Sequence, residues 1–107
     1  MRSPKLTQLM SAFALTLKAA RHHRGLSQDQ LAASTGVART YIARIELGHN
    51  QPTISVLFHL AKALDVTPED LIEQTRQRYE KSKQIQAFIS PLELASRKQR
   101  QIPPTDC

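Results

Sequence analysis

Three side chains near the middle of the chain could hydrogen-bond to the edges of nucleic-acid bases. Arg39, Thr40 and Arg44 lie within one short stretch, RTYIARIEL. With a rotation of about 100° per helical residue, Ile42 and Ile45 fall on the side opposite these three. An arginine can donate two hydrogen bonds to O6 and N7 of guanine, and a threonine can bond to either base type or touch the methyl group of thymine. The stretch therefore predicts a helix with one buried side and one side suited to reading bases.

A simpler interpretation is that Arg39 and Arg44 are solvated arginines on an exposed helix, which is where most arginines lie. A second feature favours an anionic partner. Ser27 and Gln28 lie at the expected start of the preceding helix. Backbone N–H groups at such a helix start can bind a phosphate.

Five helices are expected to position these side chains, because apolar residues recur at spacings of three and four. The predicted helices cover residues 6–23, 27–35, 39–47, 53–64 and 67–73. Ser27 and Gln30 form a capping-box pattern, and Gly25 and Gly36 suit helix ends. Thr67 suits an N-cap position before Pro68. The apolar side chains expected to pack inward are Leu6, Leu9, Met10, Phe13, Leu17, Ala20, Leu31, Ala32, Val37, Ile42, Ile45, Val56, Leu57, Leu60, Ala61, Leu64, Leu71 and Ile72.

The positive charge of the chain is concentrated toward its C-terminal end. Its 107 residues include 15 Lys and Arg against 9 Asp and Glu, a net charge of +6. Residues 1–74 carry eight basic and six acidic residues, whereas residues 75–107 carry seven and three. A positive surplus favours an anionic partner. Because the part that holds Arg39 and Arg44 is only mildly basic, specific contacts must contribute more there than bulk charge.

Several classes of protein are not indicated. The single cysteine, Cys107, excludes an intrachain disulfide and fits a reducing compartment. Polar side chains interrupt residues 6–20, so we expect a cytoplasmic protein without a signal peptide or membrane span. The four histidines lack metal-ligand spacing, and no nucleophile motif or glycine-rich phosphate loop occurs. We therefore expect no metal, no cofactor, no enzymatic activity and no obvious effector pocket.

These residues belong to a longer pattern. It begins at Leu17 as L-x-x-x-R-x-x-x-G-L-S-Q-x-x-L-A-x-x-x-G-V, and its later members are Tyr41, Ile42, Ile45, Glu46, Gly48, Pro52, Thr53, the run Leu60–Leu64, Val66 and Thr67. The pattern closely resembles the Cro/Xre helix-turn-helix family of phage repressors and bacterial regulators. The resemblance covers about residues 9–74.

The resemblance implies an all-α, five-helix, phage-repressor-like DNA-binding domain. In such motifs the second helix of the pair lies in the major groove of DNA. The resemblance implies base contacts for Arg39, Thr40 and Arg44, and a structural ion pair between Arg21 and Glu46. It also implies a glutamine, here Gln28, that touches the DNA backbone and supports the reading helix. The residues to which we assign backbone or supporting contacts are Ser27, Gln28, Tyr41, Asn50 and Gln51.

Three positions depart from the family pattern. Ala38 lies where the family usually has a serine or threonine that caps the reading helix, which predicts a less rigid helix start. His49 and Asn50 replace the lysine or arginine that is common in the following loop, so phosphate binding there would use neutral hydrogen bonds or a protonated histidine. Leu47 places an apolar side chain on the outward face.

The chain is predicted to divide into a helix-turn-helix domain at residues 6–74 and a basic extension at residues 75–107. Residues 74–86 could continue the fifth helix, Ser90–Pro91 could begin another helical turn, and residues from Ser96 onward are expected to be disordered. The extension is either a free basic tail, which could contact DNA nonspecifically, or a segment that binds a second copy or another protein. The apolar residues that favour the second interpretation are Tyr79, Ile85, Phe88, Ile89, Leu92 and Leu94.

The sequence thus favours a sequence-specific transcriptional regulator, a repressor that binds a palindromic operator in double-stranded DNA as a homodimer. Two reading helices would then lie about 34 Å apart, one turn of DNA. An antitoxin-like module that binds a toxin and represses its own operon is a second hypothesis. A nonspecific nucleic-acid-binding protein is a third.

Overall fold

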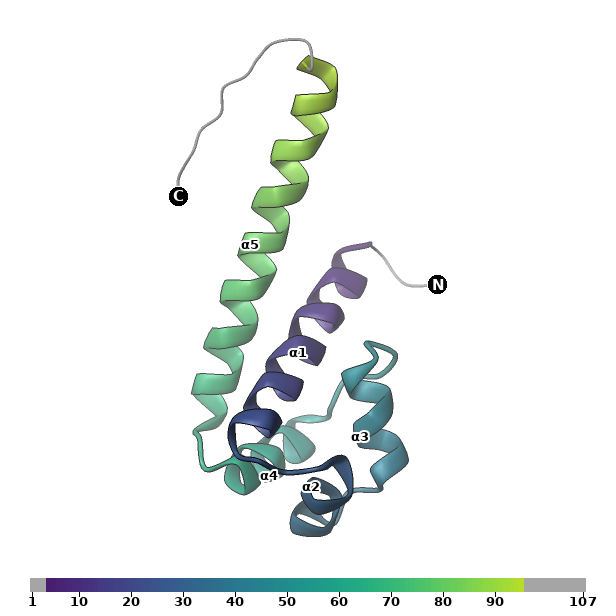
Figure 1. Cartoon of the computed structure of the whole chain (residues 1–107), viewed down its shortest axis with the longest axis vertical. Helices are drawn as coiled ribbons and strands as arrows, with labels where there is room; N and C mark the ends of the chain where they lie inside the picture. The colour runs from purple at the N-terminus through teal and green to yellow at the C-terminus, as the bar shows by residue number, and fades with distance from the viewer. Residues whose placement is uncertain (1–3, 96–107) are drawn as a thin grey trace.

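The chain folds into five helices around one core (Figure 1). The computed structural model describes the backbone of residues 4–95 and the side chains of residues 6–83. The helices are α1 (Pro4–His23), α2 (Gln28–Thr35), α3 (Arg39–Glu46), α4 (Ile54–Leu64) and α5 (Pro68–Ala95). No strand occurs within residues 4–95, which confirms the predicted all-α, five-helix fold. None of these helices is long and apolar enough to cross a membrane.

Helix α1 is the central element. It runs alongside α5, while α2, α3 and α4 gather around its C-terminal end (Figure 1). The core lies at that end, and its fully buried side chains come from every helix. The largest apolar ones are Leu17, Leu31, Ile42, Ile45, Leu60, Leu64 and Leu71.

The predicted core is correct at its centre and wrong at its edge. Leu6 and Leu9 lie on the predicted inward stripe of α1 but are exposed. The prediction that Ile72 packs inward is also wrong, because 55% of its surface is exposed whereas its neighbour Leu71 is fully buried. Leu6 and Leu9 lie in the first two turns of α1, whereas Ile72 lies near the start of α5, where it lines a groove with Leu57 of α4. The pattern identifies the apolar side of each helix, but it does not show how far its partner reaches.

Local signals at helix starts appear as predicted. The hydroxyl of Ser27 accepts a hydrogen bond from the backbone of Gln30, and the Gln30 side chain accepts one from the Ser27 backbone. The hydroxyl of Thr53 caps α4 in the same way, by accepting a hydrogen bond from the backbone N–H of Val56. Each such cap contributes about 0.5–2 kcal/mol. Ala38 has no side chain that can do this, and α3 begins without a side-chain cap.

The turn between α2 and α3 depends on Gly36. Its φ of 76° lies in the left-handed region, and its N–H donates to the carbonyl of Ala32. This conformation favours glycine because a Cβ would be strained there. The turn ends α2 and directs the chain into α3 within three residues.

Helix α5 continues without interruption to Ala95. The suggestion of a separate helical turn beginning at Ser90–Pro91 is therefore wrong, because both residues lie inside α5. The helix also crosses the proposed boundary after residue 74: Thr75 is buried, and Arg78 Nη1 donates to Thr16 Oγ1 of α1 at 3.1 Å. The division at residue 74 stays a prediction. The expected disorder from Ser96 onward lies outside the described residues.

Candidate nucleic-acid interface

The outward side of α3 carries the three side chains proposed to read bases. Arg39, Thr40 and Arg44 are all exposed, while Ile42 and Ile45 on the opposite side are fully buried. Leu47 follows the helix and is 66% exposed, in agreement with its outward placement in the sequence pattern. The arrangement leaves the hydrogen-bonding groups of three side chains available on one surface.

A buried ion pair fixes the other end of α3. Arg21 Nε lies 2.7 Å from Glu46 Oε2, and Arg21 Nη2 lies 2.9 Å from Glu46 Oε1. Gln28 Nε2 donates a further hydrogen bond to Glu46 Oε1 at 3.0 Å. The remaining Arg21 nitrogen, Nη1, donates to the carbonyl of Leu26 at 2.8 Å. One guanidinium thus connects α1, the start of α2 and the end of α3, which sets the angle between the two helices of the motif.

The electrostatics of this pair favour its charged form. Hydrogen bonding to Glu46 raises the pKa of the Arg21 guanidinium above its ordinary value, against the effect of burial. Burial alone would raise the pKa of the Glu46 carboxyl, but the hydrogen bonds from Arg21 and Gln28 outweigh it and leave that pKa lowered. Both groups therefore stay ionised near neutral pH.

The start of α2 differs in one respect from the expected phosphate site. Ser27 was expected to offer its backbone N–H, but that N–H donates to Gln30 Oε1 at 2.8 Å. Within the described part of the chain, the backbone N–H groups of Gln28 and Asp29 make no hydrogen bond. Any phosphate contact at this helix start therefore moves from Ser27 to Gln28 and Asp29.

The two arginines of α3 are held differently. Arg39 Nε lies 3.0 Å from Asp29 Oδ1 of α2, and both side chains are largely exposed. The guanidinium of Arg44 makes no hydrogen bond or ion pair with any residue that the structure describes. Sequence periodicity predicted the exposure of both residues. It did not predict the ion pair, because Asp29 and Arg39 meet only through the angle between α2 and α3.

The loop after α3 is joined to it by one hydrogen bond. Tyr41 Oη donates to the backbone carbonyl of Gln51 at 3.0 Å. Gln51 is exposed and Asn50 is partly exposed, and both are assigned backbone contacts from the sequence. Tyr41 thus acts on this loop from α3, and the contacts of Asn50 and Gln51 with DNA stay predictions.

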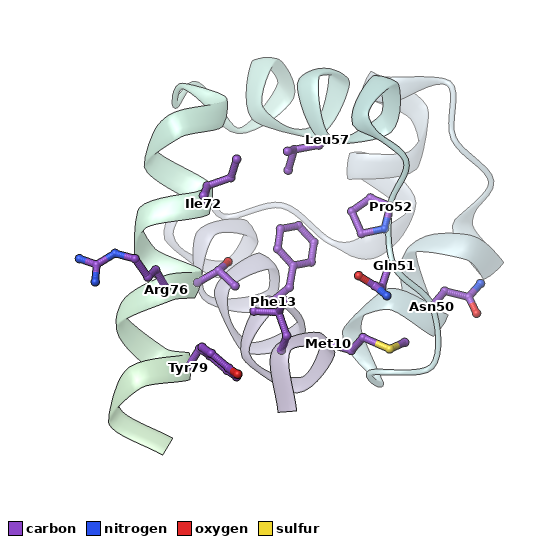
Figure 2. Close-up of a pocket in the computed structure, with 11 residues that line it drawn as sticks. Met10, Phe13, Asn50, Gln51, Pro52, Leu57, Ile72, Arg76 and Tyr79 are labelled. Atoms are coloured by element: carbon purple, nitrogen blue, oxygen red, sulfur yellow. The ribbon is translucent and has the colours of Figure 1, made fainter. Parts of the chain in front are cut away.

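A groove of about 350 Å³ lies between α1, α4, α5 and the loop from α3 to α4 (Figure 2). Its walls are mainly apolar, and the side chains of Asn50 and Gln51 lie at its loop side. The sequence does not predict this groove, and the expected absence of an effector pocket stays a prediction. The spacing of residues could not reveal a gap that depends on how far apart α1 and α5 pack. Its apolar lining residues are Leu9, Met10, Phe13, Pro52, Leu57 and Ile72.

Metal chemistry is not indicated by the part of the chain with described side chains. No group of three or more His, Cys, Asp or Glu residues is placed to hold a metal ion there.

Comparison with known proteins places the motif in a family. The profile of the HTH_3 helix-turn-helix family matches residues 17–71. The control protein C.SmaI from Serratia marcescens is 41% identical over 64 residues, which cover 60% of this chain and 74% of that protein. The uncharacterized regulator y4dJ from Sinorhizobium fredii is 34% identical over 55 residues, covering 51% of this chain and 71% of y4dJ. In the longer Escherichia coli regulator SutR, the matched part is 34% of the length.

Solved structures share the fold. The clp gene regulator ClgR from Corynebacterium glutamicum superposes with a TM-score of 0.77 over 84% of this chain and 96% of ClgR, at 19% identity, which supports the fold alone. The restriction-modification controller C.Esp1396I, solved as a tetramer with its natural 35 base-pair operator, is 30% identical with a TM-score of 0.61, over 66% of this chain and 93% of the controller. The family match confirms the resemblance seen in the sequence. This chain belongs to the HTH_3 helix-turn-helix family.

Proposed function

We propose that this protein is a sequence-specific transcriptional regulator, a repressor that binds a palindromic DNA operator as a dimer. The observation that carries the proposal is the outward side of α3. Arg39, Thr40 and Arg44 are exposed together on a helix whose buried side is fixed by Arg21 and Glu46. Rigid positioning of hydrogen-bonding groups is what direct reading of base edges requires.

In the proposed complex, α3 lies in the major groove and the start of α2 faces the backbone. Arg39 and Arg44 contact guanine edges, and Thr40 contacts a neighbouring base. The N–H groups of Gln28 and Asp29 bind a phosphate, and Asn50 and Gln51 contact the backbone farther along. The related controller C.Esp1396I was solved as a tetramer on its operator, which supports an oligomeric arrangement for this chain.

Selection from random double-stranded DNA with the purified full chain tests this proposal. We expect enrichment of an inverted repeat whose half-site centres lie about one helical turn, or ~34 Å, apart. Enrichment of a single unrepeated site would contradict the dimer. Recovery of no preferred sequence would contradict sequence-specific binding altogether.

A reporter assay tests the direction of regulation. The selected site is placed over a promoter in a host that lacks the protein, and the protein is then expressed from a separate plasmid. Repression predicts a lower reporter signal that returns when Arg44 is replaced by alanine. A higher signal would contradict the repressor role and indicate activation.

A further inference from the structure

Asp29 is an unexpected residue on the proposed DNA-binding surface. Between Ser27 and Gly48 the chain has two acidic residues, and the other, Glu46, is buried against Arg21. The side chain of Asp29 is 78% exposed and lies in the first turn of α2. A carboxylate there repels DNA phosphates and lowers the affinity for every duplex, whatever its sequence. An acid in this place needs a function that offsets that loss.

Stabilisation of the α2 dipole is one such function, because acids are favourable in the first turn of a helix. It does not account for the contact with α3. Asp29 Oδ1 lies 3.0 Å from Arg39 Nε, an ion pair across the two helices of the motif. Of its neighbours, Gln30 bonds to Ser27 within the same turn, and Gln28 reaches α3 only at the buried Glu46. Among the described residues of this turn, Asp29 alone pairs with a residue proposed to read bases.

The atom that Asp29 binds determines what Arg39 can still do. The shortest contact is at Nε, and neither terminal nitrogen of the guanidinium makes a hydrogen bond with a described residue. Those two nitrogens can form the paired hydrogen bonds that guanine accepts at O6 and N7. A carboxylate bound at Nε also partly neutralises Arg39, so its attraction to phosphates decreases.

We propose that Asp29 is a specificity-determining residue that restricts Arg39 to base edges and keeps it from phosphates. On unrelated DNA the ion pair stays closed and Arg39 adds little affinity. On the operator Arg39 binds guanine through its terminal nitrogens while Asp29 still holds Nε. Arg44, which has no acidic partner among the described residues, is the α3 arginine with which Arg39 is compared. The inference rests on the proposed function, since it requires a preferred DNA site.

The test compares binding to the selected site with binding to a scrambled duplex at several salt concentrations. The proteins are the full-length wild type, Asp29→Ala, Arg39→Ala and the double variant. Glu69→Ala is the matched control, because it removes an exposed acid from the first turn of α5, outside α2 and α3. Asp29→Asn removes the charge but keeps a hydrogen-bond acceptor. Thermal unfolding shows whether each variant is folded at the assay temperature.

Asp29→Ala is expected to tighten binding to scrambled DNA by about threefold to fivefold, the size of an exposed ion-pair effect. The slope of log affinity against log salt concentration becomes steeper by about one unit, because Arg39 gains a phosphate contact. Binding to the selected site changes less, so the ratio of specific to nonspecific affinity falls. In the Arg39→Ala background, removal of Asp29 leaves that ratio unchanged. Glu69→Ala also leaves the ratio unchanged.

Two results would overturn the inference. One is a change of equal size on both duplexes, which would mean that Asp29 acts only through its own charge. The other is that removal of Asp29 lowers the ratio of specific to nonspecific affinity in the Arg39→Ala background as well. These results leave the proposed function intact, because the wild type still prefers its site. A wild type that binds both duplexes equally overturns the proposed function and this inference together.

Discussion

The two sides of α3 perform different tasks with similar residue types. On the inner side, Glu46 is an acid that is buried and bonded to an arginine, and it connects three segments of the chain. On the outer side, Arg39 pairs with an acid that is almost fully open to solvent. Desolvation makes the first pair costly to break, whereas water and salt weaken the second. The stabilising ion pair and the residues proposed to read DNA thus lie on opposite sides of a helix of eight residues.

The largest expected effect is on the inner side. Glu46→Ala leaves Arg21 buried without its partner, so the free energy of unfolding should fall by about 3–5 kcal/mol. Urea denaturation followed by circular dichroism measures this loss. Glu73→Ala, which breaks an exposed pair in α5, is the control and should change stability far less. Equal losses for the two variants would break the distinction between buried and exposed pairs.

The pH dependence of stability tests the same pair. Because the pKa of Glu46 is lowered in the folded state, its contribution is fully present above its ordinary value of 4.5. It is lost as the pH falls through the lower, folded-state pKa. The wild type should therefore lose more stability than Glu46→Gln between pH 6 and pH 3. Parallel denaturation curves for both proteins over that range would contradict the assigned direction.

On the outer side, Arg44→Ala should leave the unfolding free energy nearly unchanged. It should weaken binding to the selected site by about 1–3 kcal/mol and relax the base preference at one position. A fluorescence-anisotropy titration against single-base variants of the site measures both effects. A uniform loss on all sequences would assign Arg44 to the phosphate backbone instead.

A smaller effect is expected at the start of α3. Ala38 has an extended backbone at the N-cap position but no side chain that accepts from the helix N–H groups. Ala38→Ser should raise the unfolding free energy by about 1 kcal/mol. A rise in the melting temperature without a change in the preferred DNA site would show that the helix start affects stability and not recognition.

The smallest expected effect concerns the contact between α3 and the loop that follows it. Tyr41→Phe removes the hydroxyl that donates to Gln51 and keeps the ring, so the unfolding free energy should fall by about 0.5–1.5 kcal/mol. Amide hydrogen exchange in residues 49–52 measures whether the loop opens more often. Unchanged exchange there would show that Tyr41 does not hold the loop.

Much of the fold could be predicted because its determinants are local. The capping box at Ser27 and Gln30, the glycine at 36 and the apolar spacing of Ile42 and Ile45 each act within a few residues. The exposure of the α3 arginines follows from the same spacing.

The features that the sequence did not predict depend on how the helices pack against one another. The sequence of a single helix does not encode that packing. The exposure of Ile72, near the start of α5, and the groove that it lines with Leu57 of α4 both depend on how α1, α4 and α5 pack. Likewise, nothing in the order Asp29 to Arg39 shows that ten residues of separation bring these charges to 3.0 Å.

The connection made by Arg21 has a consequence for how such a protein can diverge. It binds α3 through Glu46, at the end of the helix and on the side away from solvent. Exchanges at positions 39, 40 and 44 therefore leave the anchoring contacts untouched. Gene duplication followed by drift at these three codons could redirect one copy to a new target while its fold stays the same. The Arg21–Glu46 contact thus allows the residues at positions 39, 40 and 44 to be replaced without loss of the fold.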